Sequence, residues 1–242
     1  MTYCSDYHTL VTASADMTML HWNLDDVPSI KHYTLKSRWP TKHATMSMCW
    51  STSHNLLYSG TTTGTIQGWD INARQEMVTL KGHSDIVMGM IVMKSLGNLM
   101  SASLDTSIRI WDTYTEKPVH TLLGHIKGVH SLSYSADYRC LVSAGFDHEA
   151  YVWSPFVNSL LYKLKGHSSS LVGCQAVENS PELVTADSGG VIKVWDLRNF
   201  HCVQTIQAEV DEDSSRNGTS NTSRTSCFMH LTLPPARSNQ EQ

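Results

Sequence analysis

Tryptophan returns along this chain at a nearly constant interval. Five of its seven tryptophans follow one another in steps of 47, 42, 42 and 42 residues, at Trp22, Trp69, Trp111, Trp153 and Trp195. Aspartate directly follows the second, third and fifth of them. A fixed period of this length predicts structural units that stack in series, because one unit cannot bury its apolar face alone.

A second signal runs in phase with the tryptophans. Gly-His pairs end at His83, His125 and His167, and each histidine stands 28 residues before a tryptophan of the series. An aspartate lies six residues before the tryptophan at Asp105 and at Asp147. Two spacings that repeat together define one sequence unit with fixed internal positions.

The third unit shows what each repeat contains. Short β-type runs at 86–93, 99–103, 107–111 and 119–123 are separated by turn residues, which predicts four antiparallel strands, or one propeller blade. On these residues, positions 5–207 resemble the WD-repeat family, also called WD40 or G-beta repeats. The resemblance implies an all-β WD40 β-propeller of about five blades plus a partial sixth.

The spacing also predicts where the units divide. We expect five repeats, of which the first lacks its start and the second lacks Gly-His, at about 1–38, 39–80, 81–123, 124–164 and 165–207. Residues 208–226, acidic and then rich in Ser, Thr and Asn, predict a disordered loop, and 227–242 the start of a sixth blade and a tail. We therefore expect an incomplete or truncated propeller, which needs further blades or a partner to cover its open sheet edges.

Composition narrows the function classes. The net charge is −4 with no dense basic patch, which argues against nucleic acid as a partner. No apolar run of membrane-spanning length and no signal peptide are visible, so we expect no membrane association and a cytoplasmic protein. The six cysteines show neither a C-x-x-C motif nor zinc-ligand spacing with histidine, so we expect reduced thiols, no metal and no cofactor.

In the WD-repeat family, a histidine, a hydroxyl residue, an aspartate and a tryptophan form a buried hydrogen-bonded set in each blade. Carried over, the resemblance implies a complete set only in the third repeat, at His83, Ser103, Asp105 and Trp111. Two further sets are expected to be incomplete: His125, Asp147 and Trp153 with Gly145 in the hydroxyl place, and His167, Asp187 and Trp195 with Gly189 in the aspartate place.

The third set also contains the residue types of a hydrolase triad. Ser103, His83 and Asp105 could act as nucleophile, base and orienting acid, but the pattern recurs by period and an active site needs no copies. No G-x-S-x-G or H-E-x-x-H motif accompanies it. We therefore expect no catalytic residue and no enzyme, with a propeller hydrolase as the least favoured alternative.

The resemblance also implies where partners bind. WD-repeat proteins usually bind other proteins on the narrower face, through the residues after Gly-His and the residue before the turn aspartate. The corresponding positions form an expected partner-binding face of Met46, Ile86, Met88, Leu104, His130, Phe146 and Val172. Apolar and Met-containing surfaces favour interaction sites; the alternative is that several of these side chains lie in the blade cores. The leading hypothesis is a non-catalytic protein–protein interaction scaffold.

Two further resemblances suggest more specific roles. Trp195-Asp196-Leu197-Arg198 resembles the W-D-x-R box of substrate receptors that bind a cullin ubiquitin-ligase adaptor, with Arg198 as the possible adaptor contact. Residues 143–200 resemble long WD-repeat proteins of flagellated and protist cells. That second resemblance favours the cytoskeleton or the cilium within the cytoplasm.

Overall fold

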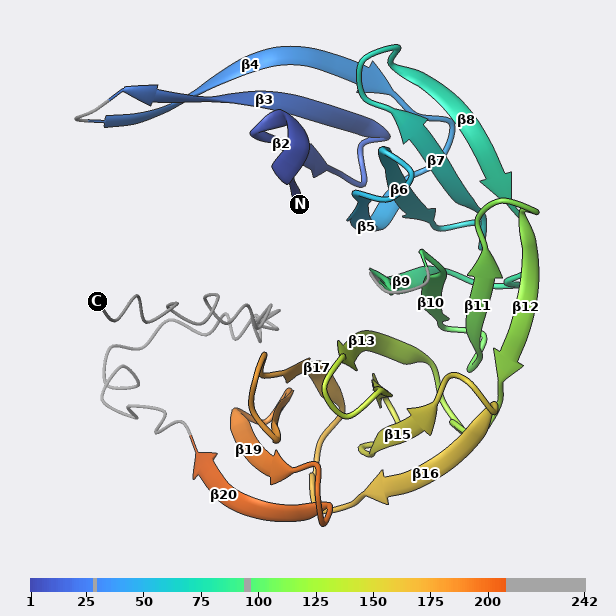
Figure 1. The fold of residues 1–242 in the computed structure, drawn as a ribbon, viewed down its shortest axis with the longest axis vertical. Coiled ribbons are helices and arrows are strands. Elements are labelled where there is room, and N and C mark those ends of the chain that lie inside the picture. The colour runs from blue at the N-terminus through green and yellow to red at the C-terminus, as the bar shows by residue number, and fades with distance from the viewer. Residues whose placement is uncertain (28–29, 94–96, 208–242) are drawn as a thin grey trace, which may run out of the picture.

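A computed structural model describes residues 1–27, 30–93 and 97–207. Its described part is all-β, with five four-stranded antiparallel sheets and a single 3-10 turn at Ser5–Tyr7. The sheets lie side by side in an arc that is open on one side, as Figure 1 shows. The architecture is therefore a WD40-type β-propeller whose described blades do not close a ring.

Each blade is built from four consecutive strands. Blade 1 contains β1 (Thr2–Cys4), β2 (Thr9–Ala13), β3 (Thr18–Val27) and β4 (Ile30–Pro40). Blade 2 contains β5 (Thr45–Ser51), β6 (Leu56–Thr61), β7 (Ile66–Asp70) and β8 (Gln75–Leu80). Blade 3 contains β9 (Val87–Val92), β10 (Leu99–Ser103), β11 (Ile108–Asp112) and β12 (Lys117–Leu122).

The last two blades repeat the pattern. Blade 4 contains β13 (Val129–Ser135), β14 (Cys140–Gly145), β15 (Ala150–Ser154) and β16 (Ser159–Leu164). Blade 5 contains β17 (Leu171–Ala176), β18 (Glu182–Asp187), β19 (Val191–Asp196) and β20 (His201–Gln207).

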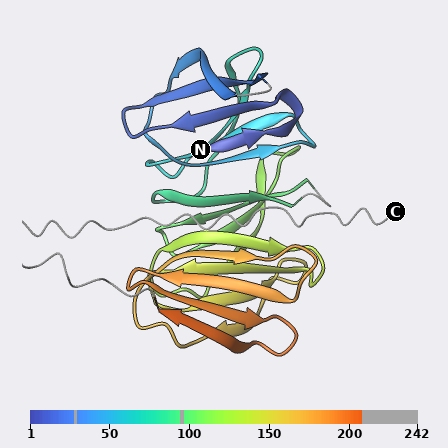
Figure 2. The same ribbon diagram turned by 90° about the vertical axis from the view of Figure 1, so that its left-hand side faces the viewer.

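Strand order within every sheet follows the chain, from the inner side of the arc to its outer side. The first strands, such as β9 and β17, line the inside of the arc and the fourth strands, such as β12 and β16, form its outer wall (Figure 1). Seen from the open side, the strands run along the short axis of the molecule (Figure 2). The turns therefore gather at two opposite faces, and residues far apart in sequence meet there.

The core lies between consecutive blades. Four buried clusters fill the four junctions, and each contains one tryptophan of the 42-residue series. Trp69, Trp111, Trp153 and Trp195 are at most 7% exposed. Burying a side chain of this size stabilises each junction by about 3 kcal/mol, which explains why tryptophan marks the period.

Blade 1 differs from its predicted form. The expectation that the first repeat lacks its start is wrong, because β1 supplies the inner strand and pairs Tyr3 with Leu10. A strand of three residues is too short for alternation to reveal it. The outer strand β4 also continues to Pro40, beyond the boundary expected near residue 38. The segments expected to form a disordered loop (208–226) and the start of a sixth blade (227–242) lie outside the described residues.

Candidate functional site: the blade hydrogen-bond sets and the loop face

In every blade a hydroxyl side chain accepts the indole N–H of the periodic tryptophan. The donor and acceptor are 2.8–3.0 Å apart, and the hydroxyl always stands ten residues before the tryptophan. The five hydroxyl residues are Thr12, Ser59, Ser101, Ser143 and Thr185.

The predicted assignment of Ser103 to this role is therefore wrong. Leu99 pairs with Trp111 and Ser101 pairs with Arg109, so Ser101 and Trp111 lie on the same face of the sheet as diagonal neighbours. Ser103 stands past a register shift at the end of β10, where its Oγ donates to the Asp85 carbonyl at 2.9 Å. Sequence spacing alone does not reveal this shift.

Blades 3, 4 and 5 each contain a complete set. The hydroxyls of Ser101, Ser143 and Thr185 lie 2.7 Å from the Nε2 atoms of His83, His125 and His167. The Nδ1 atoms of these histidines lie 2.7–2.8 Å from Asp105, Asp147 and Asp187. The expectation that only the third repeat is complete is thus wrong.

The two apparent gaps in the sequence have simple explanations. Gly145 is not the hydroxyl position of blade 4, which is filled by Ser143; a Cβ atom on Gly145 would lie 2.7 Å from His125 Nδ1. In blade 5, Gly189 holds the place of the turn aspartate, and Asp187, two residues earlier in the chain, binds His167 instead. Its second carboxylate oxygen accepts the backbone N–H groups of Gly189 and Val191.

The donors in each set fix the protonation of the histidine. Because the indole N–H donates to the hydroxyl, the hydroxyl donates to Nε2 and Nδ1–H donates to the carboxylate. Burial lowers the pKa of His83 and of His167, which keeps both rings neutral. Burial opposes ionisation of Asp105, but hydrogen bonds from Ser107 and His83 outweigh it and lower the pKa of that carboxyl. His83 and His167 are therefore neutral, and Asp105 is ionised.

Ser101, His83 and Asp105 also have the connectivity of a hydrolytic triad. The Ser101 side chain, however, is fully buried and already accepts the Trp111 N–H. The same arrangement recurs in blades 4 and 5. Across the described ranges, no three His, Cys, Asp or Glu side chains gather as a metal site, and no helix is long and apolar enough to span a membrane.

The expected partner-binding face combines residues after Gly-His with residues before the turn aspartate, and the structure brings these two groups together. Leu104 N donates to Ile86 O at 2.9 Å, and Phe146 N donates to Gly128 O at 2.9 Å. The same bond joins Ser188 to Ser170 and Thr62 to Ala44. Each loop after an outer strand is thus tied to the turn between the second and third strands of the next blade. Thr62 and Ser188 were missed because no aspartate follows them in the expected place.

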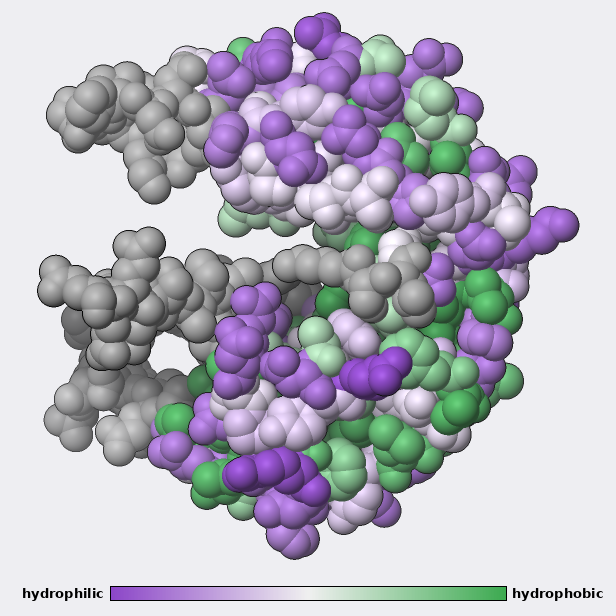
Figure 3. Space-filling view, in the orientation of Figure 1, coloured by the Kyte–Doolittle hydropathy of each residue, from purple (hydrophilic) through white to green (hydrophobic). Residues whose placement is uncertain are grey.

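The seven side chains of the expected partner-binding face are all at least partly exposed. Met46 is 45% exposed, the other six are intermediate, and none belongs to the four buried clusters. His130 meets the Phe146 ring edge to face at 5.7 Å between centroids. Figure 3 shows the opposite face, which carries the turns between first and second strands; there apolar surface gathers over blades 3 and 4, whereas blades 1 and 2 are mainly polar.

The W-D-x-R arginine has a partner in its own chain. Arg198 donates through Nε and Nη2 to the Asp196 carboxylate, with Nη2 at 2.7 Å from Oδ2. This pair lowers the pKa of Asp196. The Arg198 side chain is still 65% exposed, but the donors at one edge of its guanidinium are occupied.

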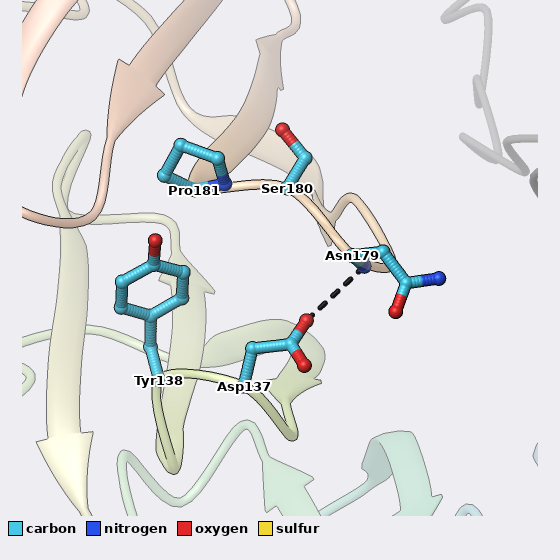
Figure 4. Close-up of a pocket in the computed structure, with 5 residues that line it drawn as sticks. All are labelled: Asp137, Tyr138, Asn179, Ser180 and Pro181. Carbon is cyan, nitrogen blue, oxygen red and sulfur yellow. Dashed lines mark hydrogen bonds between the residues drawn. The ribbon is translucent and has the colours of Figure 1, made fainter.

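A cavity opens between blades 4 and 5, beside the turns that join their first and second strands. Asp137 and Tyr138 line it from blade 4, and Asn179, Ser180 and Pro181 line it from blade 5 (Figure 4). Its volume is about 300 Å³. Sequence reasoning gave no signal for it, because the two turns are about 42 residues apart and share no motif.

Five serially packed four-stranded blades, three of them with a His–Asp–hydroxyl–Trp set, define a β-propeller of the repeat type. Four stretches match the WD40 family (WD domain, G-beta repeat), at residues 34–70, 74–112, 116–154 and 158–196. Together they cover more than half of the chain, which belongs to this family. No curated protein matches the chain in a sequence comparison. WD40 domains generally mediate protein–protein interactions and are typically not enzymes.

The family match also explains a mismatch between repeat and blade. The stretch 74–112 starts at the outer strand of blade 2 and ends with the third strand of blade 3. Every matched stretch therefore spans two blades. This arrangement links neighbouring blades covalently through each repeat.

Proposed function

We propose that this protein is a non-catalytic scaffold that binds other proteins through the partner-binding face. The observation that carries this proposal is the backbone hydrogen bond repeated in four blades, which holds Ile86 beside Leu104 and Gly128 beside Phe146. A rigid framework of this kind presents apolar side chains without a large ordering cost on binding. Their partial exposure outside the buried clusters supports the same proposal.

The absence of catalysis is part of the proposal. The three Ser/Thr–His–Asp chains are buried within blades, and each hydroxyl is occupied by an indole N–H. A nucleophile needs access to substrate and a free proton path to its base. We assign the sets to stability. We also propose a cytoplasmic location, with the cytoskeleton or the cilium favoured by the resemblance of residues 143–200.

The test compares two exposed apolar surfaces. Met88→Asp combined with Phe146→Asp places two charges on the partner-binding face, and Leu161→Asp, a 49% exposed leucine on the outer strand β16, serves as the matched control. Tagged full-length chains are used to capture proteins from cells, with quantitative mass spectrometry as the readout. We expect the double variant to lose proteins that the control retains.

Circular dichroism and thermal unfolding of the same variants separate loss of binding from loss of folding. A double variant that folds normally and captures the same proteins would contradict the proposed face. A double variant that unfolds would instead place these side chains in the core. The substrate-receptor alternative would require Arg198 to exchange Asp196 for an adaptor group, and no observation favours it.

A further inference from the structure

Each blade presents an apolar face to the blade that follows it. On this face a residue near the start of the third strand pairs with one near the end of the fourth strand. In blades 2, 3 and 4 every side chain of these pairs is at most 2% exposed: Ile66 with Leu80, Ile108 with Leu122, and Ala150 with Leu164. Each pair lies in the buried cluster that its blade shares with the next one, so the next blade covers this face.

Blade 5 has the same face, but no described element covers it. Its pair is Ile192 with Ile206, of which Ile192 is partly exposed and Ile206 is 44% exposed. Val184 is also partly exposed, whereas Val142, at the same position of blade 4, is fully buried. Blade 5 ends the arc and its face borders the open side (Figure 1). We call Val184, Ile192 and Ile206 the open face of blade 5, and apolar surface of this kind favours binding.

The first strand of the next blade covers the inner part of this face at the internal junctions. Between blades 4 and 5, β17 packs against β13 and β14, and Cys174 Sγ lies 3.7 Å from the Val142 carbonyl oxygen. Leu171, Cys174 and Ala176 reach the buried cluster from β17. These residues stand at positions one, four and six of the strand, because the register shifts after position one.

Blades 3 and 4 follow the same rule. The residues at positions one, four and six of their first strands pack in or against the clusters: Val129, Leu132 and Tyr134 in β13, and Val87, Met90 and Val92 in β9. The register shifts at the start of both strands. Apolar side chains at positions one, four and six therefore mark a strand that covers the preceding blade.

A segment beyond β20 carries this pattern in its sequence. Residues 228–233 read Phe-Met-His-Leu-Thr-Leu, which places Phe228, Leu231 and Leu233 at positions one, four and six. Residues 208–227 join this segment to β20, whereas residues 165–170 are enough to join β16 to β17. The chain is therefore long enough to bring the segment to the open face.

We propose that residues 228–233 bind the open face of blade 5 of their own chain, in the way that a first strand binds the preceding blade. Leu231, at position four, then contacts Val184, and apolar surface on both sides is removed from water. First strands pack against the inner two strands of the preceding blade at the internal junctions. Ile206, on the outer strand, therefore stays exposed.

Docking of the segment also adds a residue to the partner-binding face. Position two of the first strand contributes to that face in blades 2 to 5, through Met46, Met88, His130 and Val172. Position two of the added strand is Met229. This consequence rests on the proposed function, whereas the binding of the segment to blade 5 does not.

Nuclear magnetic resonance of the intact 242-residue chain tests the contact. With the methyl groups of Ile, Leu and Val labelled, we expect nuclear Overhauser effects between the methyl groups of Leu231 and Val184. A mixture of labelled and unlabelled copies separates contacts within one chain from contacts between two chains.

Two double variants of the segment ask whether it covers the open face. Leu231→Asp with Leu233→Asp places two charges against blade 5 and should prevent docking, because a buried unpaired carboxylate is costly. His230→Asp with Thr232→Asp places the same two charges at positions three and five, which face the other way, and is the matched control. Unchanged methyl signals of blades 1 to 4 show that each variant is folded.

A soluble gadolinium chelate measures the exposure of the open face, because it broadens the methyl signals that it can reach. We expect Val184 to be protected in the unmodified chain and in the control, and to lose this protection in the variant with Asp at positions four and six. Ile206 should be broadened in every sample and serves as the internal reference.

Three results would overturn the docking of the segment. These are no Overhauser effect between Leu231 and Val184, an effect seen only between two copies, or equal broadening of Val184 in both double variants. None of them bears on the proposed function, which the substitutions of Met88 and Phe146 test separately.

Discussion

The serine that completes the hydrogen-bonded set of blade 3 gives the sharpest test of the structure. Ser101→Ala removes the acceptor of the Trp111 N–H and the donor to His83 Nε2, which lie 2.8 and 2.7 Å from its hydroxyl. Ser101 and Trp111 are fully buried and His83 is 6% exposed, so water cannot replace the lost bonds. Each unsatisfied buried group costs about 1–3 kcal/mol. We expect a loss of about 2–5 kcal/mol in the free energy of unfolding.

Ser103→Ala is the matched comparison, because the family resemblance assigns the same role to Ser103. Among the described residues its hydroxyl bonds only the Asp85 carbonyl and the Asp105 N–H, and Asp85 is exposed. We expect this substitution to cost about 1 kcal/mol. With about 2–4 °C per kcal/mol in a chain of this size, the thermal midpoint should fall by about 4–20 °C for Ser101→Ala and by only about 2–4 °C for Ser103→Ala.

Thermal unfolding followed by far-ultraviolet circular dichroism measures both effects. In a Trp111→Phe background the indole donor is already absent, so Ser101→Ala should then cost about 1–2 kcal/mol less. A larger loss for Ser103→Ala than for Ser101→Ala, or full additivity with Trp111→Phe, would refute the assignment of the hydroxyl.

Buried histidines and the cysteines give three further predictions. Burial lowers the folded-state pKa of His83 and His167 below the ordinary value of 6.5, so the unfolded chain takes up protons first as the pH falls. The free energy of unfolding should therefore fall below about pH 6.5, by up to about 1.4 kcal/mol per pH unit for each histidine. Urea titrations at pH 7.5, 6.0 and 5.0 measure this loss. His21 is 2% exposed, its Nδ1 lies 3.5 Å from Ser37 Oγ and its Nε2 has no partner among the described residues; burial and then Lys36 and Arg74 lower its pKa. His21→Leu should raise stability by about 1 kcal/mol at pH 7.5 and more at pH 5. Equal stability at both pH values would argue against a buried ring whose Nε2 is unpaired. Among the described cysteines, Cys202 is the exposed one, whereas burial raises the pKa of the Cys140 thiol to about 11. Iodoacetamide at pH 8 should modify Cys202 at least tenfold faster than Cys140, with mass spectrometry as the readout. Comparable labelling of the buried thiols would contradict the packing.

The sequence by itself determined the repeat architecture. A tryptophan at one interval, with Gly-His in phase, specifies blades that bury the same side chain at each junction, and the buried series from Trp69 to Trp195 has this role. The histidines and aspartates of the sets could also be named from spacing, because each of these residues is chemically distinctive. Serine and threonine are common on strands, but the position ten residues before the tryptophan carries a hydroxyl in all five repeats, so the period itself favours Ser101 over Ser103.

Tertiary structure decided the rest, for reasons of register and contact. A register shift at the end of β10 separates Ser101 from Ser103, and the reach of the Asp187 side chain completes blade 5 without the expected turn aspartate. The contacts within the partner-binding face depend on backbone hydrogen bonds between segments about 18 residues apart, such as the bond from Leu104 to Ile86. The cavity beside Tyr138 exists because two turns from different blades meet, and no local pattern in the chain specifies what lies between them.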